Sequence, residues 1–506
     1  MDEDARTPGY AWYGLAILVA VYILNFIDRQ LISILAEDIK RDLGMRDEDL
    51  GFLYGTAFGV FYALFGIPLG RLADNWHRVR LLASGLALWS AMTMVSGLAR
   101  GGAMLAAARV GVGVGEASAA PSAYSLISDW FPKRLRATAL AIYSAGLYIG
   151  GGVSLGIGAL IVQRWNAAYP VDPPFGLHGW QAAFLIVGAP GLLLALVVMS
   201  LREPPRPAPR TAAPFAGFFG ELLTILPPLT LLGAARRGPR ALAGNLAAVA
   251  LLVGFVYAAT RLGEPAAQWS AWGLGVYAVF SWASALRARD PEAFRLIVAN
   301  PAFVTLLVAY GLNAFLSYST SLWLPPYAER VLGEAKTTAG LIIGATGALG
   351  GFLGTTIGGA VADRLRRRHP AGRVMVVIFG AIAPLPFIVT AFTTHSPAIF
   401  YAMVLPMTAL GSCALGAAGA TTQDLVLPRM RGTATATFLI GTTLLGLALG
   451  PYLAGRLSSA SGSLSVGVLS LLVTVPIALG AAIAAFRLVP IHEQRLADLH
   501  RMSTVN

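Results

Sequence analysis

The stretch Arg109-Val-Gly-Val-Gly-Val-Gly-Glu116 decides how the chain is interpreted, because it places two ionisable residues inside an apolar run. Arg109 and Glu116 are seven residues apart, so a helix carries both on one face, about two turns from each other. A second stretch, Asn25-Phe-Ile-Asp28-Arg29, stacks its polar groups at i, i+3 and i+4 in another apolar run. Ionisable side chains within hydrocarbon are costly, and their presence indicates function.

The composition is that of a polytopic membrane protein. Of 506 residues 56% are hydrophobic and only 12% are charged, with a mean hydropathy of +0.67, whereas soluble proteins carry about 25% charged residues. The single cysteine, Cys413, excludes a disulfide framework. The histidines lack metal-ligand spacing, and no G-x-x-x-x-G-K-[ST] motif for ATP occurs. We therefore predict no metal, no cofactor and no enzyme activity.

Apolar runs long enough to cross a bilayer, about 20 residues each, form two groups of six. The first group covers 12–36, 48–73, 80–99, 102–129, 135–162 and 180–201. The second covers 301–324, 338–363, 374–394, 398–427, 432–457 and 464–488. The predicted organisation is an N-terminal half (1–206), an inter-half segment (207–300), a C-terminal half (301–490) and a cytoplasmic tail (491–506).

The inter-half segment contains two further apolar runs, 241–260 and 269–286, and a weaker run at 215–233. We predict that the first two form a transmembrane hairpin within 241–286 and that the third lies along the cytoplasmic interface. This gives twelve core spans plus two. The alternative is that none of the three runs spans the membrane.

Most Lys and Arg residues fall in alternate loops, which indicates their topological role. The net charge of +12 is thereby explained without nucleic acid. The distribution places both termini in the cytoplasm. We expect a monomer in the cell inner (plasma) membrane, surrounded by membrane lipids.

An internal repeat relates the two halves. Gly70-Arg-Leu-Ala-Asp74 corresponds to Gly359-Ala-Val-Ala-Asp363, and Asp129 and Arg136 have the spacing of Asp424 and Arg431. Two six-span halves in the same sense are typical of parallel-repeat transporters. The second half has Val404 and Gly411 where the first has Arg109 and Glu116. This asymmetry favours a functional role for the charges over a static ion pair that only fixes helix register.

Estimates of depth, at about 1.5 Å per residue, place Asp28 and Arg109 at similar levels and predict a pair between them. Glu116 lies nearer the midplane, where burial favours a neutral carboxyl that carries a proton. The cytoplasmic ends carry further charges that form networks able to break when that side opens. We predict a cytoplasmic gate there, or, alternatively, a purely topological role, for Asp74, Arg78, Arg80, Asp129, Arg136, Asp363 and Arg364.

Several of these motifs resemble a known family. Gly66–Arg80 and Gly359–Arg364 resemble the two copies of the loop-2/3 signature of the major facilitator superfamily, although Asn75-Trp-His departs from it. The 25–30, 109–117 and 128–144 stretches are similar to the spinster branch. The resemblance is strong over 12–206, moderate over 301–488 and lacking over 210–295.

The resemblance implies alternating access by rocking of two halves and gradient-driven movement of lysolipids or sphingoid phosphates. It makes Asp28 and Glu116 the protonation sites, with Arg29 and Arg109 as partners or as anchors for an anionic head group. We expect a proton-coupled transporter of an amphipathic anion such as a lysophospholipid. The alternatives are a small organic anion or a hydrophobic drug as substrate; a sensor or an intramembrane enzyme is disfavoured. Further substrate contacts or charge partners are expected at Asn25, Tyr62, Asn313 and Ser317.

Overall fold

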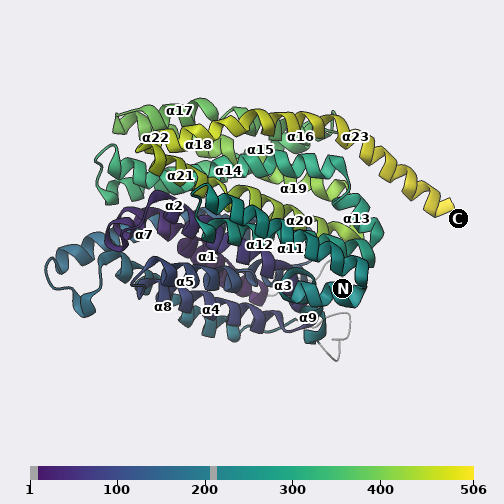
Figure 1. Cartoon of the computed structure of the whole chain (residues 1–506), viewed down its shortest axis with the longest axis horizontal. Coiled ribbons are helices and arrows are strands. Elements are labelled where there is room, and N and C mark those ends of the chain that lie inside the picture. The colour runs from purple at the N-terminus through teal and green to yellow at the C-terminus, as the bar shows by residue number, and fades with distance from the viewer. Residues whose placement is uncertain (1–8, 205–213, 506) are drawn as a thin grey trace. The chain divides into compact units, whose positions relative to one another are not determined.

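The computed structural model describes residues 9–204 and 214–505, and every regular element within them is a helix (Figure 1). By length and composition, 12 of these helices can cross a membrane. The chain is therefore an all-α polytopic membrane protein, as the composition predicts. The predicted boundary at residue 206 lies outside the described residues.

The first six predicted spans all appear as helices, and the fourth is divided. Their bounds are α1 Gly9–Leu43, α2 Asp47–Gly51, the π-helical η1 Phe52–Thr56, α3 Ala57–Asn75, α4 Arg78–Gly97, α5 Gly102–Glu116, α6 Ala119–Trp130, α7 Lys133–Ala168, the 3-10 turn η2 Pro174–Gly176 and α8 Gly179–Met199. Helix α1 runs seven residues beyond the predicted end at 36, because polar residues continue the helix past the apolar run.

The predicted fourth span, 102–129, is two helices with a break directly after Glu116. Pro121 has no N–H to donate to the carbonyl of Ala117, so the regular helical ladder cannot continue through this point. The Ser118 hydroxyl instead donates to the Gly115 carbonyl at 2.8 Å. The break leaves Glu116 as the last residue of α5.

Two glycines of α5 allow close helix packing. A Cβ at Gly113 would lie 2.5 Å from the Phe58 carbonyl of α3, and one at Gly115 would lie 2.8 Å from the Gly85 carbonyl of α4. Small residues are what lets helix backbones approach this closely. The alternation of glycine with valine therefore fixes α5 between α3 and α4.

The inter-half segment forms five helices: α9 Pro214–Ile225, α10 Leu229–Arg237, α11 Pro239–Arg261, α12 Ala266–Arg289 and α13 Pro291–Ile297. Helices α11 and α12 pack against each other as a hairpin. Helix α11 is among the helices that qualify as membrane spans and α12 is not, so a hairpin that crosses the membrane stays a prediction. The weaker run at 215–233 is not one helix. It bends by 95° between α9 and α10, because Pro227-Pro228 interrupts the helical hydrogen bonds.

The second six predicted spans are divided more often. Their elements are α14 Pro301–Arg330, α15 Lys336–Arg366, α16 Gly372–Ile382, α17 Leu385–Thr393, α18 Pro397–Ser412, α19 Ala414–Asp424, η3 Pro428–Met430, α20 Arg431–Thr442, the π-helical η4 Thr443–Leu447, α21 Gly450–Ser461, α22 Leu464–Leu469, η5 Ser470–Thr474 and α23 Val475–Val505. The last helix continues without a break through the predicted tail.

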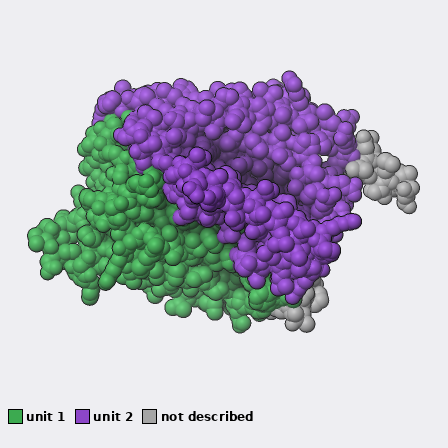
Figure 2. Space-filling model, in the orientation of Figure 1, with its two compact units in different colours: residues 1–222, 324–348 green, residues 223–323, 349–506 purple. Residues whose placement is uncertain are grey.

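The chain divides into two compact units (Figure 2). Unit 1 contains 1–222 and 324–348, and unit 2 contains 223–323 and 349–506. Residues 324–348 belong by sequence to the second six-span group. They join unit 1 because Arg330 and Lys336 pair with carboxylates of the first group, and because a Cβ at Gly344 would lie 2.3 Å from the Gly152 carbonyl.

We expect the Gly113→Ala variant to lower the thermal unfolding midpoint of the purified protein. The added methyl group meets the Phe58 carbonyl, and overpacking of this kind costs about 1–3 kcal/mol. Gly66→Ala is the matched control, since nothing lies within 4 Å of its Cβ position and alanine favours the helix. Equal midpoints for the two variants would contradict the packing role of Gly113.

Candidate functional site

A buried ion pair joins α1 to α5. The Arg29 Nη2 atom donates to Glu116 Oε2 at 2.7 Å, and the two residues are 8% and 1% exposed. Helix α1 presents Arg29 to the last residue of α5, where the break at Ala117 ends the helix. A charge-assisted bond of this length is strong in a site without water.

The second buried arginine does not pair with a carboxylate as predicted. Arg109 is fully buried, and its Nη1 atom approaches the main-chain oxygen of Asp28 at 3.5 Å. Neither carboxylate oxygen of Asp28 accepts a hydrogen bond from any described residue. Adjacent residues on a helix point about 100° apart, so Arg29 rather than Asp28 meets α5. Depth along the helix axis alone could not predict this.

The Asp28 carboxylate is fully buried beside α4. The side chains of Trp89 and Thr93 face it, but their polar atoms lie outside hydrogen-bonding geometry. Asn25, which is 3% exposed, similarly faces the Glu116 carboxylate. The predicted residues of α1 and α5 therefore gather in one polar site with unused hydrogen-bonding capacity.

Aromatic rings surround the two guanidinium groups. The Arg29 guanidinium carbon lies 4.8 Å from the Phe26 ring centre, 4.6 Å from that of Phe58 and 5.0 Å from that of Tyr62. Arg109 lies 5.3 Å from the Phe58 ring centre. Cations are stabilised over aromatic faces, more so where water is excluded. The site therefore holds its positive charges through rings as well as through Glu116.

Two predicted substrate contacts belong to unit 2. The Asn313 side chain is 4% exposed and donates to the Gly411 carbonyl at 3.2 Å. A Cβ at Gly411 would lie 3.4 Å from the Ser317 hydroxyl. Both residues thus flank α18, at the position that the repeat relates to Glu116, and their role in substrate contact stays a prediction.

The predicted cytoplasmic network of the first half centres on Arg78, which is 1% exposed. Arg78 pairs with Asp129 and donates to Glu203 at 2.8 Å and to Ser125 at 2.8 Å. Arg136 instead donates to the Phe131 carbonyl at 3.1 Å, and Asp74 and Arg80 are exposed. Glu203 was not predicted, because it follows the last apolar run of the first group and lies outside every predicted span.

A matching network in the second half centres on Arg373. Its guanidinium donates to Asp363 at 2.8 Å and pairs with Asp424. Arg364, the predicted member, is exposed and forms no ion pair within the described ranges. The signal that could have identified Arg373 is the repeat: Arg78 plus 295 is 373, and Asp129 plus 295 is 424.

A third charged group, which we call the α1-end cluster, was not predicted at all. It lies within unit 1 at the end of α1 opposite to Arg78. Arg330 donates to Asp47 at 2.7 Å and 2.8 Å and to Glu37 at 2.7 Å. Lys336 pairs with Asp38 at 3.0 Å and with Glu329 at 2.9 Å. The cluster therefore joins α14 and α15 to the first two spans.

Comparison with known proteins identifies one family that matches this chain. The model of the Major Facilitator Superfamily matches residues 18–451 and, in a second match, 306–501. Among curated relatives, an MFS-type efflux pump of Mycolicibacterium smegmatis is 29% identical and covers 90% of this chain and 86% of its own length. Protein spinster homolog 1 of Homo sapiens is 27% identical and covers 89% of this chain and 74% of its own.

Solved structures agree. The crystal structure of a bacterial homologue of the human lysosomal transporter spinster, inward-facing and occupied, is 25% identical. It has a TM-score of 0.68 and covers 97% of this chain and 96% of its own. A peptide transporter with bound alafosfalin, at 16% identity and a TM-score of 0.65, shares the fold. This chain therefore belongs to the Major Facilitator Superfamily and is a membrane transporter of the spinster type rather than an enzyme.

Proposed function

We propose that this transporter moves an anionic, lipid-like amphipath, such as a lysophospholipid, across the cell inner membrane by proton-coupled alternating access. One observation carries the proposal: two arginines and two carboxylic acids are buried together on α1 and α5, and one acid has no hydrogen-bond partner among the described residues. A permanently ionised carboxylate in such a place is costly. A carboxyl group that takes up a proton avoids this cost while it is neutral.

The balance of charge supports an anionic substrate. With a proton on Asp28, the site holds the charges of Arg29, Arg109 and Glu116, which sum to +1. A single anionic head group neutralises this site. Arg109 has two guanidinium nitrogens, Nε and Nη2, that make no hydrogen bond within the described part of the chain. The planar guanidinium donates best to a phosphate or a carboxylate, whose oxygens accept two of its hydrogen bonds.

Coupling follows from competition for Arg29. While Glu116 is ionised, Arg29 is held by it at 2.7 Å. A proton on Glu116 weakens this bond and releases the guanidinium to the substrate or to Asp28, its neighbour in sequence. Substrate binding and proton binding are then linked, because both change the same ion pair. The rings of Phe26, Phe58 and Tyr62 suit an apolar chain next to the head group.

The charged networks supply elements that break and re-form as access alternates. In the predicted topology, the Arg78 and Arg373 networks lie on the cytoplasmic side and the α1-end cluster lies on the external side. Ion pairs of this kind have discrete made and broken states, which is what a two-state transition requires. Opening toward the outside would require Arg330 and Lys336 to leave the carboxylates of α1 and α2.

A second candidate substrate class is a hydrophobic drug. The observation that favours it is the relation to an efflux pump, at 29% identity over 459 residues. The same arginines would then serve coupling alone, and the aromatic rings would contact the compound. A cationic or neutral drug gains nothing from Arg109, so the two classes differ in their dependence on this residue.

The decisive experiment is uptake of a labelled lysophospholipid into proteoliposomes under an imposed pH gradient. We expect gradient-driven uptake by the wild type. In Glu116→Gln and Asp28→Asn, the stimulation by the gradient should vanish while exchange without a gradient persists, because a neutral amide no longer binds the proton. Arg109→Gln should lower affinity for the anionic lipid by about tenfold or more, since a charge-assisted bond contributes about 1.5–3 kcal/mol.

Glu264→Gln is the control variant, because it also removes a Glu–Arg ion pair but at a place outside the α1–α5 site. Glu264 pairs with Arg456 at 3.1 Å in the loop between α11 and α12. It should retain the full gradient dependence. Absence of uptake by the wild type, or an unchanged gradient dependence in Glu116→Gln, would refute the proposal. Drug uptake at the same rate in the wild type and in Arg109→Gln would favour the second substrate class.

Removal of Arg330 should shift the protein toward opening at the α1-end cluster. Arg330→Ala deletes three short hydrogen bonds to Asp47 and Glu37. Ile34 is fully buried, and its carbonyl accepts from Lys336. The variant Ile34→Cys, made together with Cys413→Ser, therefore reports opening at this end by its reaction with a membrane-impermeant maleimide. We expect severalfold faster labelling. Arg46→Ala is the control, because Arg46 pairs with Glu48 and Asp49 of its own helix; equal labelling in both variants would count against a gate.

Arg373→Gln should impair transport more than Arg367→Gln. Arg373 pairs with two carboxylates, whereas Arg367 is exposed on the same cytoplasmic segment. Loss of this half-exposed network costs about 1 kcal/mol or less in the state that contains it. That shift changes the populations of the two states several-fold. Uptake rates of the two variants at equal expression check this prediction, and indistinguishable rates would show that Arg373 sets topology alone.

A further inference from the structure

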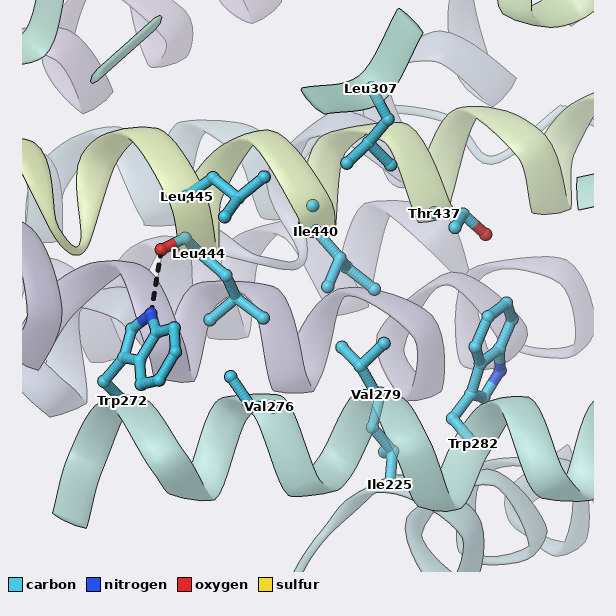
Figure 3. A pocket seen from close by; sticks show the side chains of 11 residues that line it. Ile225, Trp272, Val276, Val279, Trp282, Leu307, Thr437, Ile440, Leu444 and Leu445 are labelled. Carbon is cyan, nitrogen blue, oxygen red and sulfur yellow. Dashed lines mark hydrogen bonds between the residues drawn. The ribbon is translucent and has the colours of Figure 1, made fainter. Parts of the chain in front are cut away.

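We propose that the groove between α12 and α20 binds one anionic membrane phospholipid, separate from the transported substrate. The groove is a hollow of about 220 Å³ within unit 2 (Figure 3). Its walls are Trp272, Val276 and Val279 of α12 and Ile440, Leu444 and Leu445 of the facing helix. One wall comes from α12 of the inter-half segment, and the other comes from α20 and η4 of the second half.

The chemistry of the groove selects a hydrocarbon chain. Apart from Thr437, the side chains that line it offer only hydrocarbon and indole surface. A water molecule needs two or more polar partners to occupy a cavity, and Trp272 already donates its N–H to the Leu444 carbonyl at 3.1 Å. At roughly 30 Å³ for each water-sized group, the hollow holds on the order of seven methylene groups. That is about half of an ordinary acyl chain.

Contacts beyond the groove join the inter-half segment to the second half. At one end, Glu264 accepts from Tyr452 at 2.9 Å and from Arg456 at 3.1 Å. Burial acts to raise the pKa of Glu264, but these donors and Trp269 hold that pKa below its ordinary value, so the carboxylate stays charged and bound. At the other end, Glu292 of α13 pairs with Arg429 next to α20.

The wall contributed by the second half has an unusual backbone. Residues 443–447 form a π-helical turn, in which Ala448 donates to Thr443 at 2.9 Å. Such turns are frequent at functional sites. Here the turn directs the Leu444 carbonyl to the Trp272 indole, which leaves the Leu444 and Leu445 side chains facing the hollow (Figure 3). The groove is thus built by the hairpin and the second half together.

Basic residues at one end of the groove select the head group. Arg289 ends α12 seven residues beyond Trp282, and Arg431 begins α20 six residues before Thr437. At about 1.5 Å per residue, both lie roughly 10 Å past the end of the hollow, the distance between a phosphate and the middle of its chain. Arg287, Arg289, Arg295, Arg429 and Arg431 outnumber Asp290 and Glu292 there. An anionic phospholipid such as phosphatidylglycerol complements this charge.

The test uses the full-length protein in vesicles of phosphatidylcholine that contain a phosphatidylglycerol with a photoreactive group at mid-chain. After irradiation, peptide mapping should find the label concentrated on 272–282 and 437–445. Val279→Trp, which fills the hollow, should remove it. Val253→Trp, at a residue of α11 that is 61% exposed, should leave the labelling unchanged.

The head-group contacts are tested by the double variant Arg289→Gln/Arg431→Gln. Each arginine near an anionic head group contributes about fivefold in affinity. The preference for the phosphatidylglycerol probe over a phosphatidylcholine probe should therefore fall by about twenty-five-fold. Arg367→Gln/Arg368→Gln, two exposed arginines of the same unit, should keep the preference. Label spread evenly over lipid-facing helices, or equal labelling by the two probes in the wild type, would overturn the proposal.

Discussion

The bond between Arg29 and Glu116 is the interaction on which the rest of the buried polar site depends. Two unit charges at this separation attract strongly where water is excluded, yet each has lost its hydration. The pair is therefore stable only while both members are charged and in contact. Because Glu116 is the last residue of α5, a change in this bond acts directly on the place where the predicted fourth span is broken.

The glycines of α5 explain how such charges are accommodated. Gly113 and Gly115 bring the backbones of α3 and α4 close enough to exclude water from Arg109 and Glu116. The rings of Phe58 and Tyr62 then take the place of solvent around the guanidinium groups. The close approach of the helices therefore serves both packing and electrostatics. A methyl group at Gly113 or Gly115 would disturb it, and it also excludes water, which lowers the local dielectric and strengthens the ion pair.

The all-helical membrane fold and the helices α11 and α12 could be predicted, because hydropathy and length depend on each segment alone. The division of the predicted fourth span into α5 and α6 could not. The sequence also brought together the residues of α1 and α5. It could not predict that Arg29 rather than Asp28 meets α5, since that depends on helix rotation. Arg373 and the α1-end cluster were missed for a related reason: their partners are 51 and up to 293 residues away. The internal repeat predicts Arg373 only after the structure has shown that Arg78 is the centre of the first-half network.

Helices α14 and α15 each cross the boundary between the two compact units. In α14 the boundary at residue 324 adjoins Pro325-Pro326, and in α15 the boundary at residue 348 adjoins Gly350-Gly351. Proline removes hydrogen bonds from a helix, and glycine removes the steric limits on its torsions. At these points α14 and α15 thus carry the residue types that let a helix bend most easily. Both boundaries therefore fall where the backbone of a long helix is least restrained.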